Sequence, residues 1–143
     1  MRRTTPPPPA SGLEEAVARV GDRWSLLIVD ALLGGPRRFG ELLDDLPGLA
    51  PNVLSRRLKH LAATAVVQAT PYSRRPPRFS YALTAGGAEL AGALRLLAQW
   101  GERAHGGEAL HHDACGSELE ARWYCPTCDR VVPGEESDEL RYV

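Results

Sequence analysis

The residues best suited to chemistry lie near the C-terminus, where two pairs of metal-ligand side chains are separated by nine residues. His112 and Cys115 form the first pair, and Cys125 and Cys128 form the second, each with two residues between its members. Tetrahedral zinc sites take such imidazole and thiolate ligands from two tight turns. The spacing therefore predicts one zinc ion per chain in a short ribbon-like extension, with His111 as an alternative ligand.

A closed set of four ligands favours a structural zinc, because the tail has too few apolar residues to form a core without the ion. Two other interpretations stay open: a flexible, redox-active tail, or a zinc-responsive or protein-recruiting module. A catalytic zinc needs an open coordination position and a general base, and the H-x-E and P-C-x-x-C motifs of zinc deaminases are both absent. The sequence therefore predicts a protein that is not an enzyme.

Charge separates a basic body from an acidic tail. Residues 1–104 hold 14 Lys and Arg against 9 Asp and Glu, whereas residues 105–143 hold 3 against 9. The basic body is the part that suits contact with phosphate. No apolar run is long enough to span a membrane, and the N-terminus lacks the apolar part of a secretory signal. We therefore expect a cytoplasmic protein with no membrane partner.

The elements that position these groups begin after a Pro-rich leader. Four successive prolines exclude a helix in residues 1–10, so this segment is predicted to be disordered. Ser11 and Glu14 have the spacing of a capping box, and Gly21 ends the helix that follows. This pattern predicts that the folded body starts at Ser11.

Three further helices are predicted before residue 64. The first starts at Trp24 and is apolar nearly all round except at Asp30, which we expect to accept a hydrogen bond in the core. A short helix follows within residues 38–46, and a fourth covers residues 51–63. In the fourth helix Leu54, Leu58 and Leu61 form one apolar stripe, which leaves a polar and basic face.

A change of periodicity marks a different element after residue 64. Residues 66–73 and 78–84 are short β-branched or aromatic runs, and the basic, proline-rich segment between them predicts an antiparallel hairpin. Thr84 then caps a helix that is expected to continue to about Ala104. Leu96 and Trp100 give this last helix a second apolar face, which predicts a dimer interface.

The order of helices, basic helix, basic hairpin and apolar helix is that of a winged helix-turn-helix. The fold class predicted is mainly α with a small antiparallel β wing, over residues 11–104, and a short zinc-ribbon-like extension in residues 105–143. In this arrangement the basic face of residues 51–63 suits the major groove of double-stranded DNA.

Residues 11–104 also closely resemble the HxlR-type transcriptional regulators, relatives of the MarR group. The resemblance rests on Gly-Asp-Arg-Trp at 21–24, Gly-Pro-Arg-Arg-Phe at 35–39, Leu-Ser-Arg-Arg-Leu at 54–58, Pro-Pro-Arg at 76–78 and Tyr-x-Leu-Thr at 81–84. It implies a homodimeric DNA-binding repressor or activator, and a homodimer of this kind reads an inverted-repeat operator. Many of these regulators carry a sensor cysteine at the start of the first helix, where this chain has Ser11, so a thiol sensor is not expected there.

The candidate DNA contacts fall into two groups. Asn52, Ser55 and Arg56 are predicted to reach base edges from the start of the basic helix. The remaining candidates are expected to meet phosphates or the minor groove, with Arg57 and Lys59 otherwise solvated and Arg78 otherwise bracing the hairpin. These remaining residues are Arg37, Arg38, Arg57, Lys59, Arg74, Arg75 and Arg78.

Overall fold

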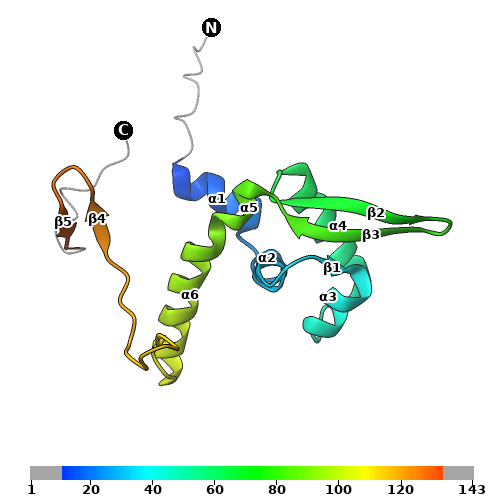
Figure 1. Cartoon of the computed structure of the whole chain (residues 1–143). Helices are drawn as coiled ribbons and strands as arrows, with labels where there is room; N and C mark the ends of the chain where they lie inside the picture. The colour runs from blue at the N-terminus through cyan, green and yellow to red at the C-terminus, as the bar shows by residue number, and fades with distance from the viewer. Residues whose placement is uncertain (1–10, 134–143) are drawn as a thin grey trace, which may run out of the picture. The chain divides into compact units, whose positions relative to one another are not determined.

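The computed structural model describes residues 11–133, which form two compact units divided between Leu94 and Arg95. The boundary lies inside the last long helix. The first unit holds the helices and the wing, and the second holds the end of the last helix and the tail (Figure 1). The leader predicted for residues 1–10 lies outside the described residues.

The first unit begins with the four helices that the periodicity predicted. These are α1 (Gly12–Val20), α2 (Arg23–Leu33), α3 (Phe39–Asp45) and α4 (Pro51–Ala63). The capping box of α1 is formed as predicted, because the Ser11 hydroxyl accepts from the Glu14 amide at 3.2 Å and the Glu14 carboxylate accepts from the Ser11 amide at 2.6 Å. Asp22 caps α2 by accepting from the amides of Trp24 and Ser25, each at 3.1 Å.

The core of this unit is built on α2 and on the apolar stripe of α4. Ile28 and Val29 of α2 are fully buried, and so are Leu54 and Leu61 of α4. The remaining buried apolar residues are Val20, Leu32, Leu42, Leu49, Leu58, Val66, Val67 and Leu94. Burying the stripe on α4 fixes the rotation of that helix, so its basic residues must lie around the rest of its circumference.

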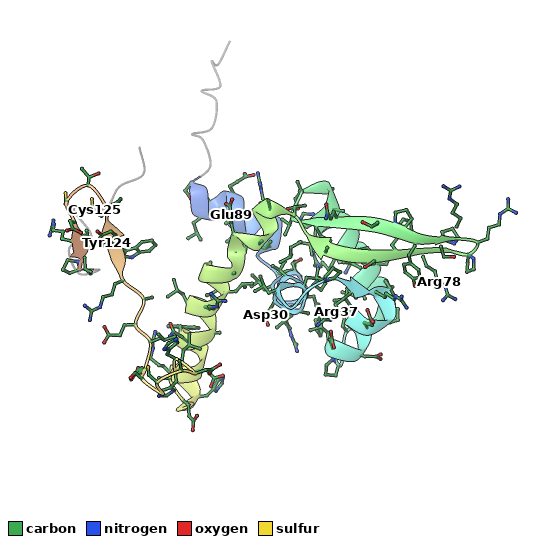
Figure 2. The ribbon with its side chains drawn as sticks, viewed as in Figure 1. Asp30, Arg37, Arg78, Glu89, Tyr124 and Cys125 are labelled. Carbon is green, nitrogen blue, oxygen red and sulfur yellow. The ribbon has the colours of Figure 1, made fainter. Side chains whose placement is uncertain are left out.

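The central helix α2, although apolar nearly all round, is not buried on every side. Asp30 is exposed, and Leu27 keeps 37% of its surface. The expectation that Asp30 accepts a hydrogen bond in the core is therefore wrong, because α2 turns this carboxylate toward solvent (Figure 2). An ionised group on an exposed face needs no protein partner.

The predicted wing is present as two antiparallel strands, β2 (Val67–Arg74) and β3 (Pro77–Leu83). It extends away from the helices of the first unit as a long hairpin (Figure 1). Its register shifts between Pro71 and Ser73. Because β2 lies at an edge of the sheet, Pro71 is tolerated there although it has no amide to donate.

A third strand, β1 (Arg37–Arg38), was not predicted. It pairs with the other side of β3, which gives the strand order β1-β3-β2 and places Arg37 opposite Tyr81. Two residues are too few to show the alternation by which a strand is recognised in a sequence. The strand matters because it ties the start of α3 to the base of the wing.

The helix predicted from Thr84 to about Ala104 is two helices, α5 (Ala85–Ala88) and α6 (Leu90–His105). The Thr84 hydroxyl caps α5 by accepting from the Gly87 amide at 3.0 Å. Gly87 packs directly on the chain before β2, since a Cβ at this position would lie 2.1 Å from the carbonyl oxygen of Val66. This close approach requires glycine, and it brings α5 against the base of the wing, where β2 begins.

The second unit contains the end of α6 and two turns of the tail. An isolated β-bridge joins His111 to Glu118, and β4 (Trp123–Cys125) pairs antiparallel with β5 (Arg130–Val132). Within residues 11–133, none of the helices combines the length and apolar character needed to cross a membrane.

Candidate nucleic-acid interface and tail turns

The outer face of α4 presents three polar side chains that the core does not use. Asn52, Arg56 and Lys59 are exposed, and Ser55 is half-buried beside them. Their exposure follows from the burial of Leu54, Leu58 and Leu61 on the opposite side of the helix. Amide, hydroxyl and guanidinium groups on one helical face can read hydrogen-bonding groups on base edges.

Two other residues of α4 face the protein, and for Arg57 this differs from the predicted contact with phosphate or solvent. The Nε atom of Arg57 lies 3.2 Å from a carboxylate oxygen of Asp22, and both side chains keep only about 30% of their surface. This contact is an ion pair without a hydrogen bond, because the N–H group of the buried Nε does not point at an acceptor. The Nε2 atom of His60 lies 3.0 Å from the carbonyl oxygen of Arg19 in α1.

The arginines before α3 also have partners within the protein. Arg37 pairs with Asp45 at 3.1 Å and donates to the carbonyl oxygen of Pro36 at 3.2 Å. The guanidinium of Arg38 lies 4.7 Å from the centre of the Tyr72 ring, which is a cation–π distance. Arg38 is exposed and keeps its hydrogen-bond donors accessible, whereas Arg37 is half-buried and largely engaged.

The wing carries its arginines at and near its tip. Arg74, Arg75 and Arg78 are exposed, and within residues 11–133 none of them forms an ion pair. Figure 2 shows Arg78 on the hairpin, close to its outer end. The tip is braced instead by Ser73, whose hydroxyl donates to the carbonyl oxygen of Pro76 at 2.9 Å. The three guanidinium groups are therefore available to an anionic partner.

A hollow of about 500 Å³ lies between α3, α4 and the wing. Ser55 lines it from α4, and Tyr72, Arg78 and Phe79 line it from the wing. Tyr81 completes one wall, and burial raises the pKa of its phenol. Phe79 was not predicted at this surface, because an aromatic residue in a strand usually indicates core packing.

The first ligand pair of the tail shares one tight turn. The Nδ1 atom of His112 lies 3.3 Å from the Sγ atom of Cys115. The amides of Cys115 and Gly116 both donate to the carbonyl oxygen of His112, at 3.2 and 2.7 Å. Gly116 has a φ of 69°, the left-handed conformation that glycine adopts readily.

The second ligand pair forms a turn of similar build between β4 and β5. Hydrogen bonds from Cys128, and a further one from the Thr127 amide, lower the pKa of the Cys125 thiol. Asp129, which follows the pair, has a φ of 52° and therefore repeats the left-handed conformation of Gly116. The Tyr124 hydroxyl donates to the carboxylate of Asp129 and so holds in place a residue that is not glycine in this left-handed conformation.

The structure does not bring the two pairs together. Within residues 11–133 there is no group of three or more His, Cys, Asp or Glu side chains arranged to hold one metal ion. Each pair of candidate ligands therefore lies in a turn of its own, and the four-ligand zinc centre stays a prediction.

Comparison with known proteins identifies relatives of this fold. Residues 19–108 match the family described as HxlR-like helix-turn-helix. An uncharacterised HTH-type transcriptional regulator of Mycobacterium bovis is 38% identical over 122 residues, which cover 82% of this chain and 77% of the relative. The structure is similar to a proposed transcription factor of Pseudomonas aeruginosa, with a TM-score of 0.68, 34% identity and coverage of 85% of this chain and 86% of the other.

A second solved structure relates the fold to another regulator group. It is a proposed MarR-family transcriptional regulator of Enterococcus faecalis, with a TM-score of 0.59 and 30% identity. The likeness covers 73% of this chain and 96% of that protein. The similarity therefore includes nearly the whole of that regulator, and residues 19–108 contain α2, α4 and the wing of this chain.

Proposed function

Because this chain belongs to the HxlR-like helix-turn-helix family of transcriptional regulators, we propose that it acts as a homodimer that reads an inverted-repeat operator. Its role is DNA binding rather than catalysis, as it is for regulators of this kind. The operator-reading surface comprises α4 in the major groove and the wing at phosphates or in the minor groove.

The observation that carries this proposal is the exposed face of α4. Asn52, Ser55 and Arg56 lie at the start of the helix on the side opposite its buried stripe. An asparagine amide suits the edge of adenine, and an arginine suits the two acceptors of guanine. These three residues are therefore the proposed base contacts.

Phosphate contacts are proposed for the exposed cations around this face. Lys59 on α4, Arg38 before α3 and the three wing arginines have accessible donors. Arg37 is a weaker candidate, because its guanidinium is already paired with Asp45. Phosphate contacts position a protein on the duplex, whereas base contacts choose the sequence.

The dimer is proposed on α6, with help from α1. Trp100 of α6 keeps 68% of its surface, and Leu96 and Leu97 are also exposed. Leu13 and Val17 expose a second apolar face on α1. A second copy of the chain that covers these side chains would remove them from water, and a two-fold axis would match that of an inverted repeat.

A structural zinc is proposed for the tail, with His112, Cys115, Cys125 and Cys128 as its ligands. The support comes from the two turns, since each holds two ligands with two residues between them and ends in a left-handed residue. The donor set of one imidazole and three thiolates fits zinc. Bound at all four positions, the ion would supply the tail with the stability that its few apolar residues cannot give.

An alternative assigns the tail a zinc- or redox-responsive role, or the recruitment of another protein. Comparing the full chain with a chain that ends at His105 separates these cases. A structural tail predicts that the shortened chain keeps specific DNA binding, whereas a responsive tail predicts that it keeps binding but no longer responds to zinc or oxidant.

The direct test of the proposed function is selection of bound fragments from the genomic DNA of the source organism, with the full chain as bait. We expect recovered fragments to share an inverted repeat with half-sites about one helical turn apart. Binding that shows no preference between recovered fragments and random duplexes would contradict sequence-specific regulation.

A further inference from the structure

Two basic residues of α4 hold the helix rather than face outward, and we infer that Arg57 and His60 are positioning residues for DNA binding. Both reach the junction between α1 and α2, at Asp22 and Arg19 respectively. This inference rests on the proposed function, in which α4 is the base-reading helix. It assigns Arg57 a role in the protein in place of a contact with phosphate.

Arg57 contacts a carboxylate that also caps α2. Asp22 accepts from the amides of Trp24 and Ser25 at the start of α2. Its position is therefore fixed by the helix that forms the centre of the core, since Ser25, Ile28 and Val29 are all fully buried. Arg57 is thereby attached to the helix at the centre of the core, and both side chains are about two-thirds removed from solvent.

The His60 contact ends on the last turn of α1. Its imidazole lies 3.0 Å from the Arg19 carbonyl oxygen, one of the groups at a helix C-terminus that lack a partner within the helix. The Arg19 side chain is held away from this contact by an ion pair with Glu15 at 2.8 Å. Thr64, one turn after His60, donates its hydroxyl back to the His60 carbonyl oxygen at 3.0 Å and so closes the end of α4.

The junction that receives both contacts is closely packed. Gly21 lies between Arg19 and Asp22, and a Cβ there would lie 2.3 Å from the Val17 carbonyl oxygen. The path from α1 to α2 at this point therefore requires glycine. Arg57 and His60 lie about one helical turn apart on α4, so two contacts to one closely packed junction restrain the rotation of α4 as well as its distance from the junction.

This restraint bears on base reading because Ser55 and Arg56 immediately precede Arg57 on the same helix. A small rotation of α4 would move their polar groups away from the atoms they must meet, and hydrogen bonds weaken steeply with poor geometry. The same junction belongs to α1, whose exposed Leu13 and Val17 are part of the proposed dimer surface. The two contacts thus link the proposed dimer helix to the base-reading helix.

A phosphate contact and a positioning contact make opposite predictions for Asp22. If Arg57 binds phosphate, removing the Asp22 charge frees the arginine and keeps or improves binding. If Arg57 positions α4, Asp22→Asn and Arg57→Gln break the same contact and have the same effect. Asparagine caps helices about as well as aspartate, so Asp22→Asn keeps the start of α2 intact.

The test compares wild type, Asp22→Asn, Arg57→Gln and the double variant on a fragment recovered by the genomic selection and on a random duplex of equal length. Affinity is measured over a series of salt concentrations, at a temperature where circular dichroism shows every variant folded. We expect each single variant to weaken operator binding by about 3- to 10-fold and the double variant to bind no more weakly than either single variant. The salt slope, which is the change in the logarithm of affinity with the logarithm of salt concentration, should match that of wild type. Lys59→Gln, on the exposed side of α4, is the matched control and should reduce that slope.

The conservative variant at the second contact gives an independent readout. His60→Gln retains a side-chain amide that can donate to the Arg19 carbonyl, whereas His60→Ala does not, so only His60→Ala should weaken operator binding. The inference would be overturned in favour of a phosphate contact if Arg57→Gln lowered the salt slope by about 0.9 while Asp22→Asn bound the operator as tightly as wild type or more tightly.

Hydrogen exchange of the free full chain tests the positioning without DNA. The α4 amides should exchange faster in Asp22→Asn and in Arg57→Gln, and at the wild-type rate in Lys59→Gln. Unchanged exchange in the first two variants would overturn the inference. A wild type that fails to distinguish operator from random DNA would instead count against the proposed function, and the exchange result would stand separately.

Discussion

The imidazole of His112 and the thiol of Cys115 lie in one turn, with 3.3 Å between Nδ1 and Sγ. The second pair, Cys125 and Cys128, occupies a turn of similar backbone shape, and each turn ends in a residue with positive φ. Two turns that each present two ligands are the halves of a tetrahedral zinc site. The four-ligand zinc centre proposed for the tail would join these two turns.

Full-length chain prepared without chelator should therefore contain about one zinc per chain. Cys125→Ser, Cys128→Ser and His112→Ala should each release the metal. His111→Ala is the control for His112→Ala and should retain it. Elemental analysis gives the stoichiometry, and absorption of the cobalt-substituted protein reports thiolate ligation. Substoichiometric metal together with three freely titrating thiols would show that the tail holds no zinc centre.

Arg56→Ala should weaken operator binding by about 1 to 3 kcal/mol and relax the choice of base at one position of each half-site, because the variant cannot form the bidentate pair with a base. Binding to a panel of operators with single substitutions measures both effects. The base-reading assignment fails if Arg56→Ala loses as much affinity for random duplex as for the operator.

The exposed wing arginines should act differently. Arg74→Ala and Arg75→Ala are each expected to weaken binding to all sequences alike and to lower the salt slope by about 0.9, because each phosphate that the variant leaves without a cation keeps its counterion. Fluorescence anisotropy across a salt series gives the slope. A slope equal to that of wild type would mean that the tip of the wing does not touch DNA.

The proposed dimer can be tested on the apolar face of α6. Leu96→Glu and Trp100→Glu should give monomers, because burying an unpaired carboxylate in an apolar interface is costly. Arg95→Glu, at an exposed polar position on the same helix, is the control and should leave the dimer intact. Sedimentation analysis measures the mass, and dimers from both apolar variants would place the interface elsewhere.

Asp22 gives a prediction for stability against pH. Burial raises the pKa of its carboxyl, but hydrogen bonds from Ser25 and the charge of Arg57 outweigh burial, so the pKa is lower than usual. The ionised form is therefore favoured by folding, and its contribution is present above the unfolded pKa of about 3.9 and is lost as the pH falls through the lower folded value.

Asp22→Asn should accordingly lower the free energy of unfolding at pH 7 by about 0.5 to 1 kcal/mol, a modest effect because both partners are partly exposed. The difference from wild type should shrink as the pH falls below about 4. Urea unfolding at several pH values measures it. A difference of constant size from pH 7 to pH 3 would assign the effect to something other than this carboxylate.

Local patterns in the sequence were sufficient for most elements of the first unit. The capping box at Ser11, the stripe of Leu54, Leu58 and Leu61, and the change to β-branched residues after residue 64 each depend on neighbours a few positions apart. The winged helix-turn-helix fold followed from these patterns, whereas the HxlR family was indicated by the resemblance of motifs such as Gly-Asp-Arg-Trp at 21–24. Both are confirmed by the comparisons. The break at Glu89, which divides the predicted last helix into α5 and α6, was not predicted.

The sequence by itself thus determined which helices form, which of their faces is apolar and which motifs the chain shares with its family. It could not determine the partners of individual charged side chains. An arginine on a basic helix looks the same whether it meets DNA or, like Arg57, a carboxylate 35 residues earlier in the chain. Only the tertiary structure decided this, since an ion pair depends on which surfaces fold together, and contacts between distant segments leave no periodic signal in the sequence.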